Sequence, residues 1–314
     1  MCVSTAHLYD KIAPASPHAL HMPSHIYSML GMWEDSIRSN LATKAAADDV
    51  ATKNYPDRTH PIVPHLSDFL VYAYLQTARD RDAQQVVDSL PNLKPFLVAQ
   101  LGIDTALAAA PARFALERGR WDEAAQLPVR DSQFPAAQSI THFARALGAA
   151  RAGNAAAARA EISRLDEIEA KLTAANNDYW AGQNPDPETG RNGMGDVFRR
   201  PARRGDCGNA PGRRSRRYQR EERGDGEQAG ADPRIIGRTL SRGRYGQGGA
   251  RRVRGVRQVM PNRFRFIAGA AAAARAIGSA DAAKRYYRAL TALVVGSDGD
   301  RPEISEARLY LAQN

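Results

Sequence analysis

Apolar side chains recur at helical spacing through most of this 314-residue chain, and no stretch shows the strict alternation of a half-buried strand. Prolines and short polar clusters divide the pattern into segments of helical length. Pro23 suits the first turn of a helix that ends near Leu30, because proline lacks the N–H that an interior residue donates. Further helices are predicted over residues 66–78, 97–109, 111–118, 122–127, 136–152, 155–175, 264–277, 280–295 and 303–312. The pattern therefore predicts an all-α fold.

A short motif recurs between these segments. It consists of glycine, any residue, an apolar residue, two mostly polar residues and a small residue. The second and third copies are 34 residues apart, and a degenerate copy without glycine covers residues 78–83. The signature residues of the four glycine copies are Gly31, Trp33 and Ser36; Gly119, Trp121 and Ala124; Gly153 and Ala158; Gly278 and Ala283.

The motif has a physical reason in helix packing. Glycine ends one helix in a tight turn, the apolar residue covers the turn, and the small residue lets the next helix approach closely. Helix pairs of this kind bury their apolar faces only by stacking on neighbouring pairs. The sequence therefore predicts an α-solenoid with a concave face.

At these residues the chain resembles the tetratricopeptide repeat family, whose 34-residue unit has the same glycine, aromatic and alanine spacing. More narrowly, residues 19–27, with Gly31, Trp33, Ser36 and Asn40, resemble bacterial tetratricopeptide proteins that contain an HMPSHI segment. The resemblance covers about residues 12–183 and 261–313 and suggests the C-terminal part of a longer member. It implies capture of a peptide or helix in the concave groove, for which Tyr27, Tyr72 and Tyr74 are candidate contacts.

Composition changes abruptly within the chain. Residues 184–259 hold 19 arginines, no lysine and nine acidic residues, so this window carries all of the formal net charge of +10. As printed, it predicts an irregular, disordered Arg/Gly-rich segment between helical repeats at 1–183 and a helix pair with a capping helix at 260–314. One pair with a cap is too little to be stable unless it docks on the first block.

We interpret this window as translated out of frame. Reading one base ahead permits helical text such as EGRRDEAIA, which resembles the in-frame residues 117–125. The shifted frame also permits glycine at position 244, which is 34 residues before Gly278. The alternative is a genuine Arg/Gly linker, which would favour nucleic-acid binding through its cations.

Candidate chemistry lies mainly in the histidines. His21 and His25 are four residues apart and share a face if one helix runs through Pro23, while His65 lies further along the chain. Imidazole is a suitable ligand for a metal ion, but no glutamate lies between His21 and His25 as a zinc protease requires. No nucleophile elbow or phosphate-binding loop is present, and no cofactor is expected.

These observations favour a binding scaffold for a protein or peptide over an enzyme. The alternative function is a metal-dependent or hydrolytic activity of the histidine-rich first repeat, and nucleic-acid binding is disfavoured. Two cysteines, Cys2 and Cys207, define no disulfide framework. No apolar run has the length of a membrane span and no secretory leader is visible. The chain as written is expected in the cytoplasm, or in the periplasm if its true N-terminus lies upstream.

Resequencing of the gene across codons 184–259 tests the frame interpretation. We expect an extra base near codon 184 and a compensating slip near codon 259, which together remove the excess of +10 charges. A DNA sequence that reproduces the printed frame would establish the Arg/Gly tract as genuine.

Overall fold

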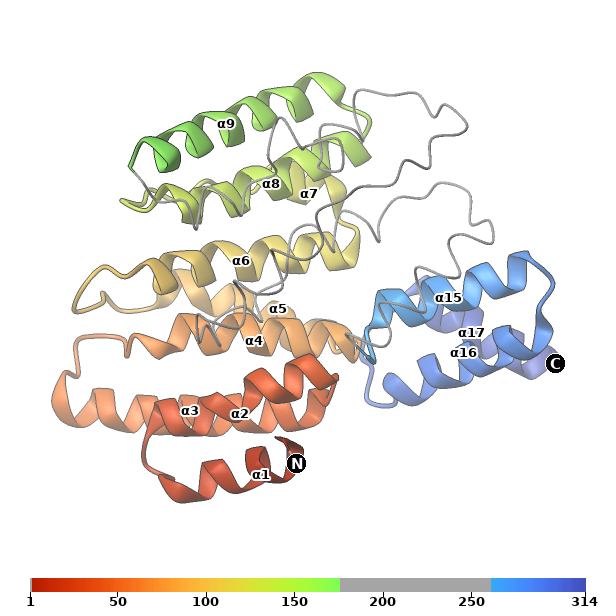
Figure 1. Ribbon diagram of the computed structural model, residues 1–314, viewed down its shortest axis with the longest axis horizontal. Coiled ribbons are helices and arrows are strands. Elements are labelled where there is room, and N and C mark those ends of the chain that lie inside the picture. Colours follow the sequence, from red (N-terminus) through yellow and green to blue (C-terminus); the bar gives the residue numbers. More distant parts are fainter. Residues whose placement is uncertain (1, 176–260) are drawn as a thin grey trace, which may run out of the picture.

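A computed structural model describes residues 2–175 and 261–314, and these residues form helices and no strand (Figure 1). The Arg/Gly-rich window predicted at 184–259 lies outside them. The first block contains α1 (Cys2–Ile12), α2 (Pro17–Leu30), α3 (Trp33–Asn54), α4 (Ile62–Gln76), α5 (Asp80–Ser89), the 3-10 helix η1 (Leu90–Asn92), α6 (Leu101–Arg118), α7 (Trp121–Ala125), α8 (Pro135–Arg151) and α9 (Ala155–Ala174). The C-terminal block contains α15 (Phe264–Ala276), α16 (Ala280–Leu293) and α17 (Pro302–Gln313).

Helices that follow one another in the sequence pack side by side. Helix α2 packs on α3, α3 on α4, α4 on α6, α6 on α8 and α8 on α9. Figure 1 shows α1 to α9 as a stack that rises in chain order, with the C-terminal block beside one edge of it. The first block is therefore built from contacts between helices that are adjacent or next but one in the sequence.

Within residues 2–175 and 261–314, five tight turns share one backbone geometry, and each turn joins the two helices of a pair. Their central residues all have positive φ: Gly31 (69°), Ala78 (56°), Gly119 (67°), Gly153 (85°) and Gly278 (73°). In each turn the next N–H donates to the carbonyl five residues earlier at 2.8–3.0 Å, the hydrogen bond of a Schellman motif. The second helix begins two residues after the turn residue, at Trp33, Asp80, Trp121, Ala155 and Ala280.

The small residues that follow these turns are fully buried. Ser36, Ala83, Ala124, Ala158 and Ala283 each have 0% exposure. They lie one helical turn into the second helix, where a larger side chain would push the paired helices apart. The degenerate copy at 78–83 therefore makes the same turn as the glycine copies, with alanine in the left-handed conformation.

Two prolines were predicted to begin or divide helices, and both predictions are wrong. Pro23 lies inside α2, which begins at Pro17 and is capped by the Ser16 side chain accepting from the Ala19 N–H at 3.4 Å. Pro111 lies inside α6, which runs unbroken from Leu101 to Arg118. Each proline removes one backbone hydrogen bond of its helix. Packing against neighbouring helices stabilises the two helices despite the missing bond.

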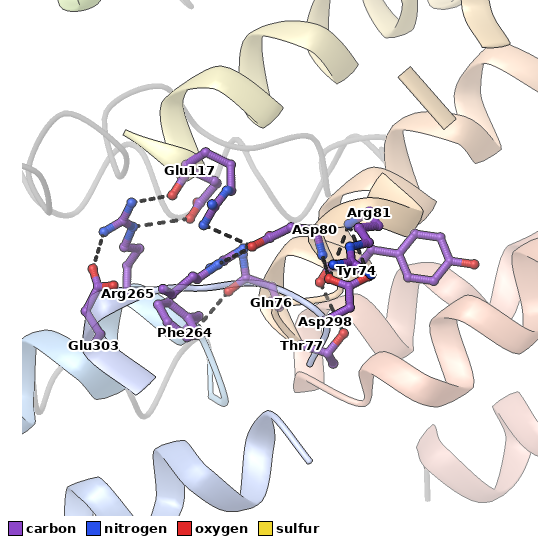
Figure 2. Close-up of polar contacts among 12 residues, drawn as sticks. Tyr74, Gln76, Thr77, Asp80, Arg81, Glu117, Phe264, Arg265, Asp298 and Glu303 are labelled. Carbon is purple, nitrogen blue, oxygen red and sulfur yellow. Dashed lines mark hydrogen bonds and ion pairs between the residues drawn. The ribbon is translucent and has the colours of Figure 1, made fainter. Parts of the chain in front are cut away.

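The C-terminal block docks on the edge of the stack where three of the turns lie. The Trp33 indole N–H donates to the Asn262 carbonyl at 2.7 Å, beside the Gly31 turn. The Phe264 N–H donates to the Gln76 side-chain oxygen at 2.9 Å, beside the Ala78 turn. Arg265 donates to the Glu117 carbonyl, beside the Gly119 turn, and pairs with Glu303 at 2.7 Å (Figure 2).

Buried charges complete this junction. The Asp80 carboxylate accepts from Arg301 and lies 2.9 Å from Arg118 Nη1, and the Arg301 side chain is only 2% exposed. Asp298 accepts from the N–H groups of Asp80 and Arg81 at 2.6 and 3.1 Å, so it caps the N-terminus of α5 (Figure 2). The C-terminal block thus supplies a cap to a helix of the first block.

Alanine at the turns tests the docking. Gly153→Ala introduces the left-handed strain alone, because its added Cβ meets nothing within 4 Å. Gly31→Ala adds the same strain and places its Cβ 2.7 Å from Asn262 Cβ and nearer still to the Pro261 carbonyl. In urea unfolding we expect a loss of about 1–2 kcal/mol for Gly153→Ala and a further loss of about 1–3 kcal/mol for Gly31→Ala. Equal losses would contradict a docked C-terminal block.

Candidate functional site

The histidines of the first repeat converge with one from the next helix pair. His21 and His25 lie on α2 and His65 on α4, and the three rings bring one nitrogen each within 4.8 Å of one another. Within the cluster, His21 Nε2 and His25 Nε2 lie 3.1 Å apart. This is a consequence of the unbroken α2: with Pro23 inside the helix, residues four apart share one face.

Asn40 on α3 fixes the tautomer of His21. Its Nδ2 donates to the Ser36 carbonyl at 2.8 Å, so Asn40 Oδ1 is the atom that faces His21 Nδ1 at 2.8 Å. An amide oxygen only accepts, and therefore His21 carries its proton on Nδ1. His21 Nε2 is then a lone pair aimed at His25.

Burial keeps the two α2 histidines neutral. The His21 side chain is 1% exposed, and burial, followed by the nearby rings of His65 and His25, lowers its pKa to about 2. Burial and the charges of His65 and His18 lower the pKa of His25 to about 4. Both imidazoles are thus uncharged and available as lone-pair donors at neutral pH.

An apolar wall closes the cluster on one side. The ring of Phe69 lies 4.8–5.1 Å from the centroids of His21, His25 and His65. Asp68, the carboxylate nearest in sequence, instead forms a buried two-pronged pair with Arg113, with both contacts at 2.9 Å. Asp68 therefore belongs to the ion pair with Arg113, and the three grouped ligand atoms are all imidazole nitrogens.

Serine-based hydrolysis finds no support in the pair of Ser24 and His21. Ser24 Oγ lies 3.4 Å from His21 Nδ1, and Ser24 is fully buried. Because His21 Nδ1 already donates to Asn40, it has no lone pair with which to accept the serine proton. The pair therefore lacks the nucleophile and base that acyl transfer requires.

Of the three tyrosines proposed as groove contacts, Tyr27 and Tyr74 are buried and Tyr72 is partly buried. Tyr27 and Tyr74 are 2% and 6% exposed. Tyr27 stacks beside His7 at 5.3 Å, and Arg79 covers the ring of Tyr74 at 4.7 Å. Tyr72 lies 5.4 Å from Trp33, and Arg263 lies within 4.8 Å of both rings. These rings are contacts between helices.

The motif residues around the first turn share a polar network. Ser28 and Ser36 hydroxyls meet at 3.1 Å across α2 and α3, and Ser39 donates to the Leu20 carbonyl at 2.6 Å. Asn40 joins this network to His21. Asn40 and Phe69 are the site residues that sequence reasoning did not assign. A signal existed for Asn40, since it belongs to the segment resembling the bacterial repeats.

Comparison with protein-family models, curated proteins and solved structures finds no match to this chain. Of the helices in residues 2–175 and 261–314, none combines the length and apolar character that crossing a bilayer requires.

The buried histidines predict a loss of stability in mild acid. Below their ordinary pKa of 6.5 the unfolded chain binds protons that the folded chain refuses, so stability is lost as the pH falls from 6.5 towards the lowered folded pKa values. We expect His21 to contribute a decrease of roughly 1.4 kcal/mol per pH unit in the free energy of unfolding. The protein is first treated with a chelator, so that no metal ion competes with protons for the histidines. Urea titrations at pH 7, 6 and 5 measure the slope.

His21→Gln is the matched variant for this measurement, because glutamine keeps a polar side chain and does not titrate. Its slope should be shallower than that of the wild type, while contributions from carboxylates cancel in the comparison. Identical slopes would show that His21 is not held neutral.

Proposed function

We propose that this protein is a helical-repeat scaffold of the tetratricopeptide type that binds a protein or peptide, rather than an enzyme. The observation that carries the proposal is the sameness of the five turns. In all five turns, the single residue after the positive-φ residue has φ between −90° and −80° and ψ between 70° and 81°. Repeated turns of one geometry give each helix pair the same internal arrangement, and a solenoid is built by stacking such similar pairs.

The arrangement of first helices supports a partner surface. Helices α2, α4, α6 and α8 are the first members of their pairs, and each contacts the next in the row. In repeat solenoids such a row lines the concave face, where long surfaces recognise extended peptides or helices. Because Tyr27 and Tyr74 are buried, we assign recognition to the partly exposed side chains of this row instead.

The alternatives have less support. A hydrolytic site built on Ser24 lacks a free base, because His21 Nδ1 donates to Asn40. Metal-dependent activity of His21, His25 and His65 stays a hypothesis that requires a bound ion. Nucleic-acid binding depends on residues 184–259, which lie outside the described residues. It stays a hypothesis that the DNA sequence of this window tests.

Peptide selection tests the scaffold proposal. Peptides selected from a displayed library against the immobilised full chain are measured by fluorescence anisotropy. We expect Thr105→Arg, at a partly exposed position of α6, to weaken binding by about tenfold or more, because arginine would occupy the contact surface.

Ser163→Arg on α9 is the control. Both hydroxyls donate to a carbonyl four residues earlier in their own helix, Thr105 to Leu101 at 2.9 Å and Ser163 to Arg159 at 3.2 Å. Both variants lose this local bond and lie on different helices of a pair. Because Thr105 is partly buried and Ser163 is exposed, thermal melting checks that Thr105→Arg is folded before the two are compared. Binding that Ser163→Arg weakens as much as Thr105→Arg would contradict recognition by the first-helix row.

A further inference from the structure

Two nitrogens of the histidine cluster, His21 Nε2 and His25 Nε2, face each other with one proton between them. His21 Nε2 is a lone pair, since Asn40 holds the proton of that ring on Nδ1. Without a cation, His25 has to place its proton on Nε2 to satisfy the 3.1 Å contact with His21. His25 Nδ1 is then a buried lone pair with no hydrogen-bond partner among the described residues. A cation between the two Nε2 atoms would instead take a lone pair from each ring, with the His25 proton on Nδ1.

The spacing suits a shared cation. Tetrahedral zinc with Zn–N bonds of about 2.0–2.1 Å separates its nitrogen ligands by about 3.3 Å. The 3.1 Å between His21 Nε2 and His25 Nε2 agrees with this value within a few tenths of an ångström. The ring nitrogen of His65 lies within 4.8 Å of the other two, so it has to approach by at most about 1.5 Å to reach the same distance.

The donor set selects the class of metal. Among the described residues the cluster offers three imidazoles and no thiolate or carboxylate. Such a donor set favours borderline late first-row divalent ions over calcium or magnesium, which prefer oxygen ligands. We infer that His21, His25 and His65 form a three-histidine site for such an ion, with zinc as its simplest occupant. Three protein ligands leave one position of a tetrahedron for water or an external ligand.

The surroundings have the features that such sites use. The Nδ1–H of His21 donates to Asn40, which orients the ring and increases the basicity of Nε2. Phe69 contacts all three rings and limits access of solvent on its side. Because two ligands lie on α2 and one on α4, the ion would join the first helix pair to the second.

Metal titration of the full chain tests the site. Chelator-treated protein is titrated with Co²⁺, followed by visible absorption, and then with Zn²⁺ as competitor. We expect one ion per chain, the intense spectrum of tetrahedral Co²⁺, displacement by Zn²⁺, and a higher melting temperature in the presence of Zn²⁺. His25→Gln and His65→Gln should lose this binding, and Asn40→Leu should weaken it by about 10- to 100-fold.

His142→Gln is the control variant, because His142 lies on α8 and contacts Glu161 at 2.7 Å, away from the cluster. It should bind Co²⁺ like the wild type. Far-ultraviolet circular dichroism confirms that each variant is folded, and X-ray absorption of the zinc-loaded wild type counts imidazole ligands without any substitution. Absence of a bound ion, fewer than three imidazoles, or unchanged affinity in a His25→Gln/His65→Gln double variant would overturn the site.

Discussion

The left-handed turn at the end of each first helix is the constraint on which the other features of this structure depend. A positive φ at Gly31, Ala78 or Gly119 lets the chain reverse within two residues, which places the second helix against the first. The close approach is then possible only because the residues that follow are as small as Ser36 and Ala124. At position 31 a glycine is needed for a second reason, because Pro261 and Asn262 occupy the space that a side chain would take.

Polar contacts rather than a large apolar face hold the C-terminal block on this edge. Its first helix is rich in alanine, so burial of its side chains contributes little area for each residue. Asp80, Arg118 and Arg301 meet at the junction, and Asp298 caps α5. Breaking one partner of a buried pair of this kind costs about 3–5 kcal/mol. Such pairs specify one docking geometry because Asp80 reaches both arginines in that geometry.

The histidine cluster is an extension of the same repeat architecture. The α2–α3 turn places Asn40 beside His21, and the stacking of α4 on α3 brings His65 and Phe69 to the same place. A metal ion at this point would link two helix pairs near one end of the first-helix row proposed to bind a partner. Binding of the ion and order in that row would then be coupled, because both depend on the relative position of α2 and α4.

The sequence by itself determined the helical class, the positions of the turns and the small residues behind them. These follow from local rules: glycine tolerates positive φ, and helical periodicity is visible in any single segment. It did not determine the interiors of α2 and α6, where packing overrides Pro23 and Pro111. Nor did it place Tyr27 and Tyr74 inside the molecule, because periodicity does not say which neighbour covers a helix face. The meeting of His65 with His21 and His25, and of Asp80 with Arg301, joins residues 40 to 221 positions apart. Only the tertiary structure decided those contacts, since they depend on how whole helices stack.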